Sequence, residues 1–370
     1  MNNLSKFGNL APEKINLINI IPLGRVSSVF LQGFLDGHPK IINLLCFEFQ
    51  NIRKFTNKSL DSLIEEIYLT MALAVKDNGY DLSKEFPKKV FTTYTKEYVE
   101  NFGFNRKSLF IGIYYAYAKY TKMDLNKIKY ILVLNHVHIE SLDSLKIFPK
   151  QKMIFAVRDP RSNFLSLKKG LGLFGIFSQQ KNGFTLFKKM LKNKPLNVLA
   201  IRHEDLHTKF DYVKKRLSNF LEIPDSKTLN SSTFLRKPFY GLGNMSASST
   251  KLRSNLPNKK FVSDSWRYEL STSEIKNIQF FSSRFMKTFG YKKIYNFEPL
   301  QINLFDTRFI GLSKEFVKTR KGVSKIILLS LRSIYNLPII GGLTCKAFVG
   351  FLLTYNFFKG YFKIKYTKIF

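Results

Sequence analysis

The stretch that decides the fold is residues 15–41, INLINIIPLGRVSSVFLQGFLDGHPKI. It begins with an Ile-rich apolar run at 15–21, which has the length and composition of a buried parallel strand. A proline and a glycine at 22–24 end this run, and from Ser28 onward large apolar residues recur at the i, i+4 spacing of a helix. A tight turn between a strand and a helix presents backbone N–H groups to an anion. We therefore predict an anion-binding turn around Arg25 and the hydroxyls that follow it.

Strands and helices also alternate through the rest of the chain. Apolar runs predict further strands at 41–47, 130–134, 152–157 and 196–201. Helical periodicity predicts helices at 59–75, 84–101, 106–120, 141–147, 160–169, 204–221 and 273–289. Such alternation is typical of a parallel sheet with helices on both faces. The expected fold class is α/β.

The composition indicates a packed protein with a strong positive charge. Of the 370 residues, 45% are hydrophobic and 15% aromatic, which is typical of a folded core. Lys and Arg outnumber Asp and Glu by 60 to 26, and the net charge of +34 predicts attraction to nucleic acid, an acidic membrane, an anionic polysaccharide or a charged nucleotide. Two cysteines form no disulfide framework or metal pattern, and the N-terminus lacks a signal peptide, so we expect a reducing, cytoplasmic location.

The last part of the chain differs from the rest. Basic residues there are interleaved with two uncharged blocks of 12 residues each, at 334–345 and 347–358. Each block is too short to span a bilayer, so we expect a membrane-surface element at the inner face of the membrane or a hairpin packed on the domain. The alternative is that these residues extend the core. We predict two domains, 1–296 and a basic and apolar C-terminal extension at 297–370.

The turn after the first strand resembles the 5′-phosphosulfate loop of sulfotransferases, which reads R-S-G-T-T-x-L and is followed by L-x-x-H-P. The matching positions are Arg25, Ser28, Leu31, His38 and Pro39. Ser27 stands in place of the family's glycine and Val29 in place of its second threonine. A Walker A sequence would need a second glycine followed by lysine, and the turn contains neither.

Four later stretches resemble the same family in the same order, at 153–166, 198–221, 235–246 and 266–291. In the first of them, Arg158 at a strand end precedes Ser166 by eight residues, which is the spacing with which the family binds the 3′-phosphate of its donor. A guanidinium supplies a fork of donors to such an anion. In the second stretch, Arg202, Glu204 and Asp205 are expected to form a structural charge cluster that caps the next helix.

The resemblance implies a P-loop-like three-layer sandwich and 3′-phosphoadenosine 5′-phosphosulfate (PAPS) as the donor, with no metal. The implied donor-binding residues are Arg25, Val26, Ser27, Ser28, Val29, Arg158, Ser166, Asn244 and Ser246. Arg25 is expected to stabilise the departing oxygen by its charge, because a guanidinium does not give up a proton near neutral pH. Backbone N–H groups of 26–29, with the two serine hydroxyls, are expected to hold the 5′-phosphate.

Three residues are candidates for the base that takes the proton of the acceptor hydroxyl. Glu48 lies ten residues after His38, where carbohydrate and protein-tyrosine sulfotransferases often carry a glutamate. His136 lies 22 residues before Arg158, near the position of the histidine that cytosolic small-molecule sulfotransferases use, and His138 lies on the same strand face. Either type of residue is a competent base, and the glycan-type motifs favour Glu48 slightly.

The first hypothesis is an enzyme that transfers a sulfuryl group from PAPS to a hydroxyl of a glycan, glycolipid or similar acceptor. The second is a basic protein that binds nucleic acid or membrane and whose donor site has decayed, an alternative supported by Ser27 and Val29. No helix-turn-helix, zinc finger or similar module is recognisable, so we expect no nucleic-acid partner. A nucleotide kinase is disfavoured because the Walker lysine is missing.

Overall fold

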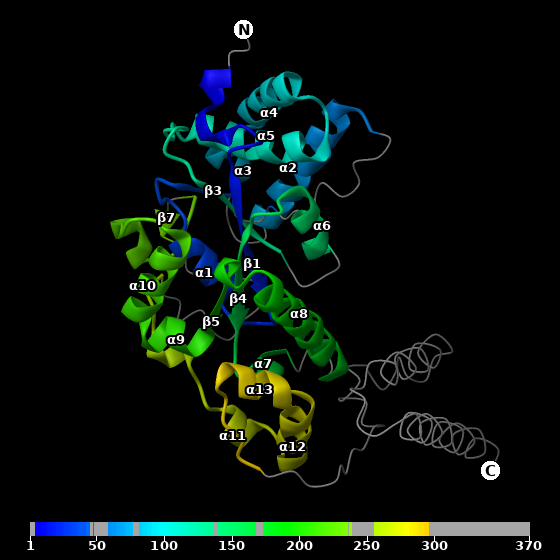
Figure 1. Cartoon of the computed structure of the whole chain (residues 1–370), viewed down its shortest axis with the longest axis vertical. Helices are drawn as coiled ribbons and strands as arrows, with labels where there is room; N and C mark the ends of the chain where they lie inside the picture. Colours follow the sequence, from blue (N-terminus) through cyan, green and yellow to red (C-terminus); the bar gives the residue numbers. More distant parts are fainter. Residues whose placement is uncertain are drawn as a thin grey trace, which may run out of the picture. The chain divides into compact units, whose positions relative to one another are not determined.

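The computed structural model describes residues 4–44, 47, 58–76, 81–135, 140–167, 173–235, 237–238 and 255–295 (Figure 1). The chain divides into two compact units, one of residues 1–159 and 179–264 and the other of residues 160–178 and 265–370. This division runs through the first of the two predicted domains. The predicted boundary at 296/297 and the extension beyond it lie outside the described residues and stay predictions.

The first unit is built on a five-stranded sheet with the strand order β2-β3-β1-β4-β5. The strands are β1 (Asn16–Pro22), β2 (Ile41–Asn43), β3 (Tyr130–Leu134), β4 (Lys152–Val157) and β5 (Val198–Arg202). Every neighbouring pair is parallel, and β1 lies in the middle, where Ile20 is paired with Leu134 on one side and with Ile154 on the other. The prediction of an α/β fold with a central parallel sheet is confirmed.

Alternate side chains of the strands point to two separate cores. On one face, Ile18 and Ile20 pack with α1 (Ser28–Phe34), α9 (His203–Thr208) and α10 (Phe210–Leu221). On the other face, Leu17 belongs to a core formed with α2 (Leu60–Lys76), α4 (Lys88–Phe102) and α5 (Arg106–Tyr120). Figure 1 shows these helices on the two sides of the sheet. Both faces are covered, which explains why β1 carries buried apolar residues on both of its faces.

Other helices lie around this frame. They are α3 (Leu82–Glu85), α6 (Glu140–Ile147), α8 (Leu173–Asn193) and the 3-10 turns η1 (Leu4–Leu10), η3 (Pro195–Asn197), η4 (Lys227–Asn230) and η7 (Lys259–Phe261). A short hairpin joins β6 (Thr233–Phe234) to β7 (Lys237–Pro238). The predicted long loop at 231–265 therefore contains some regular structure among its described residues.

Two predicted helices are each divided in the structure. The helix predicted at 84–101 is α3 and α4, because Phe86 precedes Pro87 and is held out of the helical region, with φ −156 and ψ 87. The helix predicted at 204–221 is α9 and α10, which meet at the non-helical Lys209. Sequence reasoning also gave no helix at α8. Its buried stripe includes Gln180 as well as Phe187 and Met190, so the apolar periodicity is interrupted.

The second unit contains α7 (Pro160–Leu167), α11 (Trp266–Glu269), α12 (Thr272–Phe281) and α13 (Ser283–Phe289). Its core gathers Phe164, Leu270 and Ile278 around Trp266, which is 1% exposed. The guanidinium carbon of Arg161 lies 4.0 Å from the Trp266 ring centre. Two local features fix the helix ends: a capping box at the start of α12 and Gly290 after α13, whose φ of 73 suits glycine.

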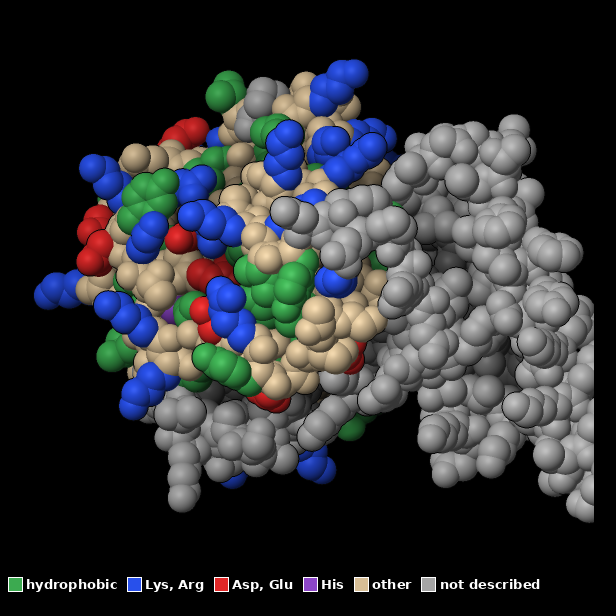
Figure 2. Space-filling model, turned by 90° about the horizontal axis from the view of Figure 1, so that it is seen from below, with side chains coloured by type: hydrophobic (Ala, Val, Ile, Leu, Met, Phe, Trp, Pro, Cys, Tyr) green, Lys and Arg blue, Asp and Glu red, His purple; other side chains and the backbone are tan. Residues whose placement is uncertain are grey.

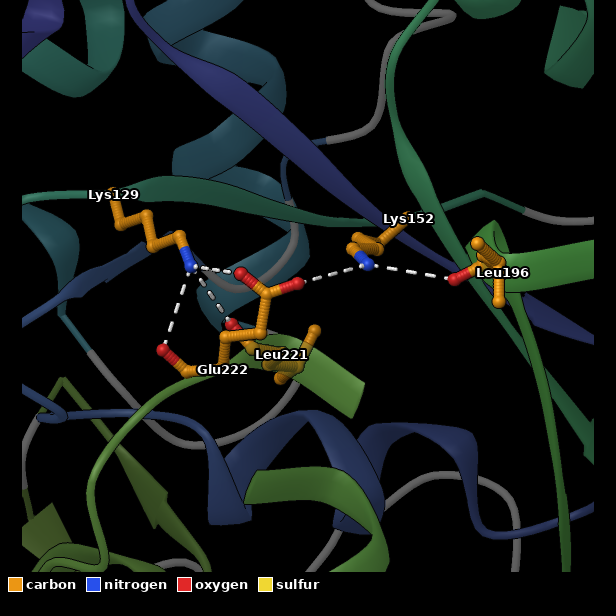
Figure 3. Close-up of polar contacts among 5 residues, drawn as sticks. All are labelled: Lys129, Lys152, Leu196, Leu221 and Glu222. Carbon is orange, nitrogen blue, oxygen red and sulfur yellow. Dashed lines mark hydrogen bonds and ion pairs between the residues drawn. The ribbon is translucent and has the colours of Figure 1, made fainter. Parts of the chain in front are cut away.

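An ion-pair cluster joins α10 to the amino ends of β3 and β4 (Figure 3). The Nζ of Lys129 donates to Oε2 of Glu222 at 2.9 Å and to the last carbonyls of α10, while Nζ of Lys152 lies 3.5 Å from Oε1 of Glu222. The hydrogen bond and charge of Lys129, followed by the charge of Lys152, lower the pKa of Glu222. Glu222 has φ 52, and both of its carboxylate oxygens are engaged.

The lowered pKa of Glu222 predicts a pH-dependent contribution to stability. Replacing Glu222 with Gln should lower Tm at pH 7, where the carboxylate is charged in the folded and the unfolded chain. The difference should disappear as the pH falls below the ordinary glutamate value of 4.5 and through the lowered folded value, because the carboxyl is then protonated in both states. Thermal melts at pH 7 and pH 3 test this. Glu100→Gln, at an exposed position of α4, is the control, and a Glu222 effect of equal size at both pH values would contradict the prediction.

Within the described ranges, no helix combines the length and the apolar character that a bilayer crossing requires. The apolar blocks at 334–345 and 347–358 fall outside those ranges.

Candidate functional site

The strand order singles out one edge of the sheet. From β1 the chain turns to β2 and β3 on one side, and from β3 it crosses to β4 and β5 on the other. The segments that leave β1 and β4 therefore diverge, and a sheet with this strand order is expected to form a crevice between their carboxyl ends. In open parallel α/β sheets this crevice is where ligands bind. The topology thus selects the β1–α1 loop and the residues after β4, which are the two places that carry the predicted Arg25 and Arg158.

The β1–α1 loop follows a tightly specified path. Gly24 has φ 111, which glycine adopts without a steric penalty, and the N–H of Leu23 bonds to the carbonyl of Ala156 in β4 at 3.0 Å. Val26 is 2% exposed and anchors the loop in the core. Ser27 is left-handed as well, with φ 57 and ψ 33, which costs a residue with a side chain about 1–2 kcal/mol. Its conformation explains why the resembled family has glycine at this position.

The two predicted strand ends lie side by side. The guanidinium Nη1 of Arg158, the residue after β4, donates to the backbone carbonyl of Arg25 at 3.3 Å. Pro22 and Ala156 are paired across the strands just before them. Arg158 is half-buried, so its charge is incompletely screened by water. The carboxyl ends of β1 and β4 therefore carry a positive charge, and the donors there suit an anion.

Two histidines of α9 hold the hydroxyl of Ser27. Its Oγ lies 2.9 Å from Nδ1 of His203 and 3.5 Å from Nε2 of His207. The Nε2 of His203 lies 3.1 Å from the carbonyl oxygen of Phe261 and must carry the proton, so Nδ1 accepts from the Ser27 hydroxyl. The Nδ1 of His207 accepts from the backbone N–H of Asn258 at 3.4 Å, which leaves its Nε2–H to donate to Ser27. The Ser27 hydroxyl is thus both donor and acceptor within the protein.

Both imidazoles are neutral at pH 7. Burial, followed by the charge of Arg158, lowers the pKa of His203 to about 2 and that of His207 to about 4. The side chains are 4% and 5% exposed. Phe30 stacks on His207 with the ring centres 5.0 Å apart. The pair therefore contributes directed hydrogen bonds to the site and no positive charge.

The charges at the end of β5 and the start of α9 are structural, as predicted. The Nε of Arg202 lies 3.9 Å from a carboxylate oxygen of Glu204 and 3.8 Å from one of Asp205. The Oε1 of Glu204 also accepts from the backbone N–H of Asp159 at 2.9 Å. Glu204 and Asp205 lie in the first turn of α9, where a negative charge is favourable. This cluster fixes the residue next to Arg158 in place.

His38 of the H-P motif has a structural role. Its Nδ1 accepts from the N–H of Lys40 at 3.1 Å, and its Nε2–H donates to the carbonyl of Pro224 at 3.2 Å. The side chain is 0% exposed, and burial lowers its pKa. It connects the turn between α1 and β2 with the segment after α10. This contact lies at the amino-terminal edge of the sheet, opposite the edge that carries Arg158.

The other predicted site residues divide into two groups. Ser28 is 8% exposed at the start of α1, and Val29 packs against both cores of the first unit. Ser166 lies on α7 in the second unit, and its predicted contact with the donor stays a prediction. The remaining predicted residues lie outside the described part of the chain: Glu48, His136, His138, Asn244 and Ser246.

Sequence reasoning missed His203 and His207. The charges of Arg202, Glu204 and Asp205 dominate this stretch of the sequence, and His203 stands among them. Their spacing of four residues places them on one face of a helix, which could have indicated a pair. Their partner Ser27 lies 176 and 180 residues away in the sequence, and no local pattern predicts such a contact.

Two further features bear on ligands. Among the residues with described positions, no group of three or more His, Cys, Asp or Glu side chains is placed to hold a metal ion. A pocket of about 390 Å³, bordered by Asp36, Asp124 and Lys127 among others, lies where the chain enters β2 and β3. That is the amino-terminal edge of the sheet, so this pocket is separate from the carboxyl ends of β1 and β4, where Arg158 lies.

Comparison with known proteins finds similar solved structures. A scan against protein-family models and a search of curated proteins give no match. The sulfotransferase domain of the Synechococcus PCC 7002 olefin synthase is 15% identical, with 75% of this chain and 96% of that chain covered and a TM-score of 0.45. The sulfotransferase domain from the curacin biosynthetic pathway is 17% identical, with 75% and 98% covered and a TM-score of 0.43. Both of these solved structures are sulfotransferase domains.

Proposed function

We propose that this chain is a sulfotransferase that transfers a sulfuryl group from PAPS to a hydroxyl of a glycan, a glycolipid or a similar acceptor. The observation that carries the proposal is the bond from the Arg158 guanidinium to the carbonyl of Arg25 at the carboxyl ends of β1 and β4. In the resembled family, the corresponding strand ends bind the 3′-phosphate and the 5′-phosphosulfate of one nucleotide. Here the two strand ends are adjacent, as binding a single nucleotide requires.

Sulfuryl transfer makes demands that residues of this chain could meet. The departing phosphate oxygen needs positive charge, and nucleophile and leaving group must lie in line. We assign the charge to Arg25, the 3′-phosphate to Arg158 and Ser166, and the 5′-phosphate to backbone N–H groups of residues 26–29. Because the hydroxyl of Ser27 donates to His203, we assign Ser27 only a backbone contact with the donor.

The base is proposed among Glu48, His136 and His138. His136 follows Asn135, whose N–H bonds to the carbonyl of Ile20 at 3.0 Å and whose side chain bonds to Asn19 at 3.1 Å. The start of the segment that carries both histidines is therefore fixed to β1. Turnover of Glu48→Gln and His136→Ala separates the first two candidates. Turnover near that of the unmodified chain in both variants would eliminate both and leave His138.

Adenosine 3′,5′-bisphosphate is expected to stabilise the chain if the donor site is intact. At a ligand concentration of about 100 Kd, a one-site ligand adds roughly 2.7 kcal/mol to the free energy of unfolding. A thermal melt with this nucleotide measures the effect, and adenosine 5′-monophosphate is the matched control because it lacks the 3′-phosphate. We expect a clear rise in Tm with the bisphosphate and a much smaller one with the control. Equal shifts with both nucleotides would refute the assignment of Arg158 to the 3′-phosphate.

The same samples test the alternative of a basic polyanion-binding protein. Figure 2 shows Lys and Arg side chains spread over one face, with Asp and Glu side chains interspersed among them. No Tm shift with the bisphosphate, together with tight binding to DNA that weakens steeply with salt, would favour this alternative. Transfer of labelled sulfate from PAPS into a cell extract, followed by identification of the labelled molecule, then tests the acceptor class. Peripheral membrane contact through residues 297–370 is part of the proposal for a lipid-linked acceptor.

A further inference from the structure

We propose that His203 and His207 are positioning residues that hold the β1–α1 loop in its left-handed turn through the hydroxyl of Ser27. That the loop held in this way serves the sulfuryl donor rests on the proposed function. Nothing in the sequence resemblance assigns these two histidines a role.

The geometry makes Ser27 the point at which the loop is held. Its φ of 57 is unfavourable for any residue with a side chain, so an interaction elsewhere must offset this cost. The Oγ accepts one hydrogen bond from His207 and donates one to His203, at 3.5 and 2.9 Å. The carbonyl of Ser27 in turn accepts from the N–H of Leu31 at 2.9 Å, which starts α1. Fixing the hydroxyl therefore fixes the backbone that begins the helix.

The histidines are themselves held from behind. The carbonyl of Phe261 fixes Nε2 of His203, and the N–H of Asn258 fixes Nδ1 of His207. The two imidazoles are in contact edge to face, with their ring centres 4.7 Å apart, and the ring centre of Phe261 lies 5.1 Å from that of His207. With almost no exposed surface, neither ring can rotate without losing both of its bonds. The chain of bonds therefore transmits the position of segment 258–261 to the β1–α1 loop.

Substitution by amides separates the two contacts of each ring. The polar end of an Asn side chain takes the place of Nδ1, and that of a Gln side chain takes the place of Nε2. His203→Asn therefore keeps an acceptor for Ser27 and loses Phe261, whereas His203→Gln keeps Phe261 and loses Ser27. For His207 the pattern is reversed, because its Nε2 contacts Ser27: His207→Gln keeps Ser27 and His207→Asn keeps Asn258. A role limited to anchoring segment 258–261 predicts the opposite order within each pair.

Two measurements on the four full-length variants test the proposal. The first is hydrogen exchange of the Leu31 amide without ligand, which should be about threefold to tenfold faster in His203→Gln and His207→Asn, as expected for the loss of one hydrogen bond. His203→Asn and His207→Gln should stay close to the unmodified chain. The second is the affinity for adenosine 3′,5′-bisphosphate, which should fall by a similar factor in the same two variants only. Ser27→Ala, which removes the hydroxyl and retains the strained backbone, should match the affected pair.

The outcomes distinguish this proposal from the proposed function. If the bisphosphate does not bind the unmodified chain but exchange follows the crossed order, the proposed function fails and the positioning role stands. If the bisphosphate binds and neither measurement follows the crossed order, the positioning role is overturned and the proposed function stands. Exchange in Ser27→Ala equal to that of the unmodified chain would also overturn the positioning role. Circular dichroism spectra identify any variant that fails to fold. If one of the two substitutions at a histidine does not fold, the other substitution at the same histidine is compared with the unmodified chain.

Discussion

Arg158→Met is expected to weaken binding of adenosine 3′,5′-bisphosphate by about 10- to 150-fold. The range corresponds to the loss of hydrogen bonds to a charged group, roughly 1.5–3 kcal/mol. Methionine keeps much of the apolar length of the arginine and removes its charge and its bond to the carbonyl of Arg25. Calorimetric titration measures the change. Arg216→Met, on α10 where the guanidinium lies 5.5 Å from the Tyr212 ring centre, is the matched control and should bind as the unmodified chain does.

The same substitution has a consequence that needs no ligand. Because the Arg158 charge lowers the pKa values of His203 and His207, its removal should raise both. Burial is the larger cause and persists, so both values should stay below the ordinary histidine value of 6.5. NMR titration of the histidine resonances measures this. Unchanged pKa values would show that Arg158 does not face the two histidines. Raised pKa values with an unchanged nucleotide affinity would show that Arg158 faces the histidines but does not bind the donor.

Raised pKa values also change the acid stability of the folded chain. A buried neutral histidine contributes stability that is present above pH 6.5 and is lost as the pH falls toward its folded pKa, because the unfolded chain takes up the proton first. In the unmodified chain this loss extends down to about pH 4 for His207. We expect Arg158→Met to lose less stability over the interval from pH 6.5 to 4. Denaturant unfolding at the two pH values measures the difference.

The sequence carries the strands of this fold more clearly than their arrangement. β3 and β4 were predicted at the residues where they occur, because each is a short apolar run bounded by turn residues. The strand order is not a local property, since β1 pairs with β3 and β4, more than a hundred residues away. The adjacency of Arg25 and Arg158 followed only from a resemblance whose motifs lie at two strand ends. The structure adds the pairing of β1 with β4, after which the chain diverges, and this gives a reason for that adjacency independent of any relative.

What local patterns missed has a common physical cause. The break before Pro87 was available from the sequence, because a residue that precedes proline is disfavoured in a helix. The hydrogen bonds between Ser27 and the two histidines could not be predicted from the sequence, because they join the β1–α1 loop to α9, which lies far along the chain. Such polar contacts leave no periodic trace in the sequence.

A buried network of hydrogen bonds around Asn19 also connects β1 with β3 and β4. Asn19, in the middle of β1, is 0% exposed; its Nδ2 donates to Ser144 at 3.2 Å and to Gln151 at 3.1 Å, and its Oδ1 accepts from Asn135 at 3.1 Å. Gln151 also donates to the carbonyl of Phe148 at 3.2 Å. One amide thus joins β1 to the end of β3, to α6 and to the residue before β4. Every polar group of Asn19 is satisfied, as burial requires.

Asn19→Ala is therefore expected to lower the free energy of unfolding by about 2–4 kcal/mol, because Asn135, Ser144 and Gln151 each lose a buried hydrogen bond. Denaturant unfolding measures the loss. Asn219→Ala, at an exposed position of α10, is the control and should change stability by less than about 0.5 kcal/mol.

A second substitution shows whether the loss comes from unpaired polar groups or from the missing volume. In the Asn19→Ala background the buried amide of Gln151 has already lost its bond to Asn19, so Gln151→Met should cost less stability there than in the unmodified chain. If the loss came only from the missing volume, the stability losses of the two single variants would add up to that of the double variant. Because Asn135 directly precedes His136, the Asn19→Ala variant should also lower turnover if either proposed histidine acts as the base, and leave it unchanged if Glu48 does. An Asn19→Ala variant as stable as the Asn219→Ala control would mean that the network contributes nothing to the fold.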